Sequence, residues 1–175
     1  RRAILIIICV IKLCFHTQSL STCGDIHLSL VQSIPLTGAV IVSTPQDIAL
    51  ADAKKGVNMF QMESINVPVL GIVENMAYFT PLELPNNKYY IFGKEGAKGL
   101  AEKLEVDLLA QIPLVQSVRE AADAGRPAAL QESTPISLEL LSMTKKILES
   151  INNRNVNLAP TKAVELTHSK GCSSK

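Results

Sequence analysis

The chain is poor in aromatic residues and has no tryptophan; Phe, Tyr and Trp together make up 4% of its 175 residues. A core must therefore be aliphatic, and the apolar share of 47% is too high for a disordered chain. The length suits one domain or a large piece of one. Charge is also scarce, at 19% charged residues and a net charge of +1. No basic stripe of the kind that nucleic-acid binders carry is present, so we expect no nucleic-acid partner.

The cysteines form no C-x-x-C pair; they stand at Cys9, Cys14, Cys23 and Cys172. A disulfide framework is not expected in a chain of this length with this much apolar content, so the cysteines favour a reducing compartment and a cytoplasmic location. His168 and Cys172 are four residues apart, but two ligands do not complete a zinc site. We therefore predict no metal site.

No apolar run is long enough to span a membrane, so we expect no membrane partner. Arg1 and Arg2 precede an apolar run at residues 3–10 that looks like the start of a secretion signal, although Lys12 interrupts it. Three interpretations stay open for residues 1–22, an atypical apolar segment: a secretion signal, a buried strand of a chain that began further upstream, or damaged sequence such as a frame error.

From Gly38 onward, short apolar runs alternate with helical patterns. Continuous apolar runs predict buried strands at residues 38–43, 67–73 and 107–112, the last closed by Pro113. Helical patterns predict helices at residues 46–62, 93–104 and 115–124, and a last one from Ser133 or Thr134 to about residue 151. Gly125 suits the position after a helix, and Pro135 suits the first turn of one. Residues 77–92 are predicted to form a long loop and residues 152–175 a polar tail.

This alternation predicts an α/β fold in which helices flank a parallel sheet. The unbroken apolar run at residues 3–10 suits a parallel strand beside residues 38–43. Ligands bind such sheets at the carboxyl ends of the strands. The places to search for a site are therefore residues 43–45, 74–76 and 112–113, which follow the predicted strands.

Six strings stand in a specific order and spacing: residues 24–30 (GDIHLSL), 38–46 (GAVIVSTPQ), 69–76 (VLGIVENM), 91–93 (IFG), 110–114 (AQIPL), and 119–120 (RE) with 123–127 (DAGRP). Together they closely resemble the Mrp/ApbC group of MinD-like P-loop ATPases. The resemblance implies a partial MinD-like P-loop NTPase fold, with residues 23–151 as the C-terminal part of the ATPase domain. It also implies a dimeric ATPase that carries an iron–sulfur cluster and hands it to recipient apoproteins.

The phosphate-binding half of that family has no counterpart in this sequence. There is no G-x-x-x-x-G-K-[ST] string, whose backbone N–H groups and lysine would hold polyphosphate. The family also has an Asp-x-Pro-Pro-Gly-Thr-Gly-Asp string that helps to place Mg²⁺ and the attacking water. Here only Gly24 and Asp25 match it, and Gln18 takes the first aspartate position, where an amide binds Mg²⁺ less well. Asp25 is a candidate catalytic residue near a γ-phosphate, or else the N-cap of a helix at residues 26–32.

Family members that hold a bridging [4Fe–4S] cluster use a C-x-x-C pair in the loop after the Glu-Asn-Met string. Residues 77–92 contain no cysteine, so these ligands are absent here. The base-binding side is retained, because Asn75 resembles the family residue that hydrogen-bonds adenine and Pro113 and Leu114 are expected to flank the base. Gly24 is carried over as a nucleotide-site residue. Without the resemblance, Asn75 is a turn residue and Pro113 ends a strand.

The resemblance thus implies an ATP-binding and ATP-hydrolysing carrier that uses ATP and Mg²⁺, acts as a homodimer and assembles or transfers [4Fe–4S] clusters, although this chain alone is expected to be inactive. An alternative is a degenerate, non-catalytic paralogue that keeps a dimerisation or partner-binding surface. A third reading, which rests only on residues 1–23, is a processed lipoprotein outside the cytoplasm.

Overall fold

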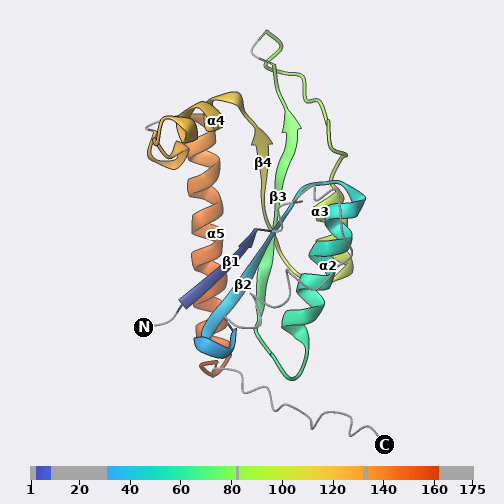
Figure 1. Ribbon diagram of the computed structural model, residues 1–175, viewed down its shortest axis with the longest axis vertical. Coiled ribbons are helices and arrows are strands. Elements are labelled where there is room, and N and C mark those ends of the chain that lie inside the picture. The colour runs from blue at the N-terminus through green and yellow to red at the C-terminus, as the bar shows by residue number, and fades with distance from the viewer. Residues whose placement is uncertain (1–2, 9–30, 82, 132–133, 162–175) are drawn as a thin grey trace, which may run out of the picture.

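The computed structural model describes residues 3–8, 31–81, 83–131 and 134–161 (Figure 1). Its elements in chain order are β1 (Ala3–Ile8), β2 (Leu36–Ser43), α2 (Asp47–Gln61), β3 (Val69–Phe79), α3 (Gly96–Lys103), β4 (Leu108–Leu114), α4 (Gln116–Asp123), the 3-10 helix η1 (Ala128–Leu130) and α5 (Pro135–Asn157). Residues 31–33, just before β2, are also helical. Gly24, Asp25 and most of the helix expected at residues 26–32 lie outside the described residues.

The four strands form one parallel sheet in the order β1-β2-β3-β4. Central residues such as Val40, Ile41 and Ile72 are at most 1% exposed, as expected for strands that helices cover on both faces. β1 pairs with β2, so the strand predicted at residues 3–10 is confirmed over Ala3–Ile8. The predicted α/β fold with a parallel sheet flanked by helices is therefore confirmed.

The helices form two layers, with α2 and α3 on one face of the sheet and α5 on the other (Figure 1). Because β2, β3 and β4 follow one another across the sheet, crossovers of one hand place α2 and α3 on the same face. The core on their side surrounds the fully buried Phe60 and includes Leu36, Ile41, Val57, Ile72 and Ala97. The core beneath α5 is aliphatic and includes Val40, Leu70, Val73, Leu109, Ile112, Ile136 and Ile151.

Two helix boundaries follow the predicted chemistry. Thr134 is the N-cap of α5, where its side chain accepts a hydrogen bond from the N–H of Ser137 at 3.2 Å, and Pro135 begins the helix. Gly125 follows the end of α4 with φ +67°, a conformation that glycine adopts without steric cost. At both positions, the local sequence was sufficient to predict where the helix begins or ends.

Two strands, β3 and β4, continue past the residues expected to end them. β3 runs to Phe79, so the loop expected at residues 77–92 begins after that residue. β4 includes Pro113 and ends at Leu114, so the prediction that Pro113 closes the strand is wrong. From Asn75 to Phe79 β3 advances four residues, whereas its partner β4 advances two, from residue 112 to 114. A proline at such an interruption removes no regular ladder hydrogen bond, so the strand tolerates it.

α3 begins later than predicted, at Gly96 rather than at Gly93. Glu95 has φ +54° and Gly93 has φ +108°, and neither value is compatible with a right-handed helix. The chain therefore turns before the helix starts.

α5 extends to Asn157, beyond the end predicted near residue 151. Arg154 in this extension is 7% exposed, and its guanidinium donates to the carbonyl oxygen of Ala159 at 2.7 Å. Further on, the Thr161 hydroxyl donates to the carbonyl oxygen of Leu36 at the start of β2. The polar composition predicted a loosely held tail from residue 152. Instead, the Arg154–Ala159 bond links two parts of residues 152–161, and Thr161 joins this segment to β2.

Candidate functional site

The carboxyl ends of β2, β3 and β4 meet at one edge of the sheet, which we call the rim (residues 43–46, 74–76 and 111–114). Asn75 of β3 pairs with Ile112 of β4, the residue directly before Pro113. Asn75, Pro113 and Leu114 are all half-buried, so they retain surface with which to contact a ligand. The structure thus brings these three residues to one edge, while Gly24 and Asp25 lie outside the described residues. Their role in binding stays a prediction.

Met76, the next residue after Asn75, has φ +56°, a left-handed conformation that is costly for a residue with a Cβ. It lies where β3 carries extra residues relative to β4, and the resulting bulge redirects the end of β3. Strained residues of this kind cluster at functional sites. This bulge could not be predicted, because methionine is not a residue that marks left-handed positions.

Glu74 lies directly before Asn75 and is 0% exposed. Its Oε2 accepts a hydrogen bond from the backbone N–H of Ala97, in the first turn of α3, at 2.6 Å. Its Oε1 accepts a hydrogen bond from Nε2 of Gln111 at 2.8 Å. The strand register aligns Ser43, Glu74 and Gln111 across β2, β3 and β4. Sequence reasoning placed Glu74 at the edge but missed its burial, for which the available signal was a carboxylate at the end of an apolar run.

The turn after β2 packs directly against the start of α3. A Cβ added to Gly96 would lie 2.8 Å from Cδ1 of Leu50 and 3.0 Å from the carbonyl carbon of Pro45, closer than ordinary van der Waals contact. The glycine therefore allows the backbone of α3 to touch this turn. Within the turn, Oγ1 of Thr44 and Oε1 of Gln46 are 2.9 Å apart and hydrogen-bonded. α3 thus contacts both the β2 part and the β3 part of the rim.

An arm, residues 80–81 and 83–92, follows β3 and projects beyond the rim (Figure 1). Phe79 and Tyr89 close its base through reciprocal backbone hydrogen bonds of 2.8 Å. Nζ of Lys88 lies 4.0 Å from the ring centroid of Tyr78, which is within cation–π range. The arm exposes the large apolar side chains of Leu84, Tyr89, Tyr90 and Ile91. Clustered exposed apolar residues suit contact with another protein.

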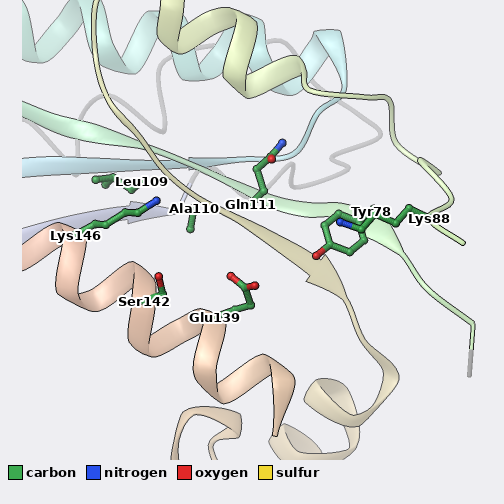
Figure 2. Close-up of a pocket in the computed structure, with 8 residues that line it drawn as sticks. All are labelled: Tyr78, Lys88, Leu109, Ala110, Gln111, Glu139, Ser142 and Lys146. Atoms are coloured by element: carbon green, nitrogen blue, oxygen red, sulfur yellow. The ribbon is translucent and has the colours of Figure 1, made fainter. Parts of the chain in front are cut away.

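A pocket of about 260 Å³ lies between β4 and α5 and is lined by Tyr78, Lys88, Leu109, Ala110, Gln111, Glu139, Ser142 and Lys146 (Figure 2). Three of these side chains reach from α5 toward β4. Gln111 points away from α5 in the same view, in agreement with its hydrogen bond to Glu74. None of the predicted base-binding residues lines the pocket, so it is separate from that part of the rim.

Within the described ranges, no group of three or more His, Cys, Asp or Glu side chains is placed to hold a metal ion. All four cysteines of the sequence lie outside those ranges. The helices of the described part include none that is long and apolar enough to cross a membrane.

Residues 21–151 match the protein family described as ParA, NUBPL iron-transfer P-loop NTPase. The chain is 46% identical over 134 residues to the iron–sulfur cluster transfer protein NUBPL of Dictyostelium discoideum, which covers 74% of this chain and 41% of that protein. It is 54% identical over 107 residues to the iron–sulfur cluster carrier protein of Escherichia coli, which covers 61% of this chain and 28% of that protein.

Among solved structures, the chain is similar to the nucleotide-binding protein in complex with ADP from Archaeoglobus fulgidus. The TM-score is 0.55 at 36% identity, over 66% of this chain and 45% of that one. The chain therefore spans less than half the length of the curated relatives described above and of this structure. The residues that match the family include the whole rim and the arm.

Proposed function

Because the chain belongs to the ParA family of NUBPL iron-transfer P-loop NTPases, a family of iron–sulfur cluster carriers, we propose that it supplies the adenine-recognition edge of an ATP-dependent carrier. In this proposal the rim binds the base of ATP, while Mg²⁺ and the phosphates are held elsewhere in the carrier. The [4Fe–4S] cluster is the cargo, which passes to recipient apoproteins. The carrier works as a cytoplasmic homodimer.

The observation that carries this proposal is the position of Asn75 beside Pro113 at the carboxyl edge of a parallel sheet. An asparagine side chain offers both a donor and an acceptor, which matches the adjacent donor and acceptor on an edge of adenine. Pro113 and Leu114 are half-buried on the neighbouring strand, where apolar surface can pack on the flat base. The rim therefore supplies both the polar and the apolar contacts that a purine needs.

The described residues do not fit a cluster site of the usual kind. Clusters are held by thiolates, and residues 77–92 contain no cysteine. We therefore assign base recognition to this chain and assign no cluster ligand to the arm. Residues that hold Mg²⁺ are likewise not assigned, because no cluster of carboxylates within the described ranges suits a metal ion.

Calorimetric titration of the full chain with adenosine, and separately with guanosine, tests the proposal. We expect weak binding, because no phosphate contacts contribute, and a preference for adenosine of about tenfold from two hydrogen bonds to the base. Asn75→Ala should remove that preference. Asn87→Ala, which changes an exposed asparagine of the arm, is the matched control and should leave the preference intact. A wild-type chain that binds neither nucleoside, or both equally, contradicts the proposal.

A partner-binding module without nucleotide chemistry is the second candidate, favoured by the exposed apolar residues of the arm. Ile91 is 59% exposed and Leu84 is 47% exposed, although neither supports the core. If the arm mediates pairing of two copies, sedimentation velocity should show a dimer that Ile91→Ser weakens. A wild-type chain that stays monomeric at high concentration would exclude this role in self-association.

A further inference from the structure

We propose that Glu74 is a positioning residue for the adenine-recognition edge: its buried carboxylate fixes the end of β3, the end of β4 and the start of α3 as one unit, and so sets the place of Asn75. The ligand in this inference is the adenine of the proposed function. The physical claim about Asn75 can be tested without any ligand.

The carboxylate of Glu74 connects two elements besides its own strand. One oxygen accepts the N–H of Ala97, which is one of the amides at the start of α3 that has no partner within the helix. The other oxygen accepts the side-chain amide of Gln111 on β4. A carboxylate suits this position because it can only accept, and both neighbours donate.

The burial of Glu74 indicates that its carboxyl group serves to hold the neighbouring elements in place. Glu74 is 0% exposed, and it takes part in none of the ion pairs between described residues. Burying a carboxyl group without a cation beside it costs free energy. An apolar side chain at this position, like those that precede it in β3, would avoid that cost. Polar groups buried at such a cost can specify one arrangement of the elements they join. Here those elements are the two strands that carry Asn75 and Pro113.

The start of α3 extends this connection to the third strand. Gly96 lies against the turn after β2, and its neighbour Ala97 is held by Glu74. A movement of α3 would therefore change its contacts with Pro45 and with Glu74 at the same time. Asn75 is covalently next to Glu74, and the ladder to β4 is interrupted directly after its pair with Ile112, where Met76 is strained. The direction of Asn75 therefore depends on this anchor as well as on that last regular pair.

The test compares Glu74→Leu with Glu74→Gln in the full chain by two-dimensional NMR and amide hydrogen exchange. In Glu74→Leu we expect exchange at Ala97 to accelerate by about tenfold or more, because one buried hydrogen bond is lost. The side-chain amide signals of Asn75 should shift or broaden. Glu74→Gln should restore both readouts, because the new oxygen can accept from Ala97 while Gln111 turns its own oxygen toward the new amide.

Two further variants separate positioning from general destabilisation. Ile151→Ala creates a cavity beneath α5 and lowers the free energy of unfolding. It should leave the NMR signals of Asn75 unchanged. The exchange rate at Ala97 should also be unchanged once it is corrected for the more frequent global unfolding of this variant. Gln111→Met removes only the β4 partner, so it should shift Asn75 while Ala97 stays protected. This variant keeps the test decisive if Glu74→Leu does not fold.

The inference is overturned if Gln111→Met and any folded Glu74→Leu chain leave Asn75 unchanged, or if Glu74→Gln disturbs Asn75 as much as Glu74→Leu does. Adenosine titration of the same variants then separates the two proposals. A wild-type chain that binds no adenosine ends the proposed function, while the NMR result still decides the role of Glu74. A wild-type chain that binds adenosine, with affinity reduced by about tenfold in Gln111→Met, supports both.

Discussion

Replacing Gly96 by alanine tests how closely α3 is pressed against the turn after β2. The added Cβ would lie 2.8 Å from Cδ1 of Leu50, 3.0 Å from the carbonyl carbon of Pro45, and closer still to the oxygen of that carbonyl. Leu50 can rotate away, but the Pro45 carbonyl is backbone, so the helix itself must shift. Overpacking costs about 1–3 kcal/mol, and we expect the free energy of unfolding to fall by an amount toward the upper end of that range.

Gly99→Ala is the matched control, because it lies in the same helix and its added Cβ would have no atom within 4 Å. Alanine is preferred to glycine inside a helix by about 1 kcal/mol, so this variant should be more stable than the wild type. Urea unfolding, followed by far-ultraviolet circular dichroism, measures both changes at constant m-value. If Gly96→Ala proves as stable as the wild type while Gly99→Ala gains stability, the claimed contact does not exist.

Three other variants test separate parts of the structure. Thr134→Ala removes the acceptor for the N–H of Ser137 and should lower the free energy of unfolding by about 1 kcal/mol in thermal denaturation, whereas Thr134→Ser should not. Arg154→Met keeps an apolar stem but loses the bond to Ala159, so amide exchange at Leu158, Ala159 and Thr161 should accelerate; unchanged exchange would show that this contact does not hold the segment. Met76→Ile places a β-branched residue at φ +56° and should cost about 1–2 kcal/mol in urea unfolding, and a neutral result would contradict the bulge.

The centre of the fold was predictable because continuous apolar runs decide it. β2 and β3 are apolar on both faces, and only a strand covered by helices on both sides meets that condition. The C-terminal end of α4 and the start of α5 were predictable because Gly125 and Thr134 act on their immediate neighbours. Parallel pairing then brings Asn75 next to the residue before Pro113, so the approach of these two positions also followed from the strand pattern.

The features that were missed have no clear signal in a local stretch of sequence. Glu74 is buried because Ala97 and Gln111 donate to it, and neither partner is visible from a local window. The extension of α5 depends on a site that receives the guanidinium of Arg154, although the surrounding composition is that of a solvated tail. The bulge at Met76 has no sequence marker at all. For Glu74, contacts distant in sequence outweighed the local preference.

The order of the strands has a consequence for how the domain assembles. β2, β3 and β4 lie side by side in the order in which they are synthesised, so each can dock on its predecessor as the chain emerges. α5 then folds back over the strands, and the hydroxyl of Thr161 reaches Leu36, 125 residues earlier in the chain. Contacts across so long a separation form only after the entropy of closing the loop has been offset. The Thr161–Leu36 contact should therefore form last, and energy transfer between dyes at the exposed residues Gln32 and Ala159, near the two ends of this contact, would report when folding is complete.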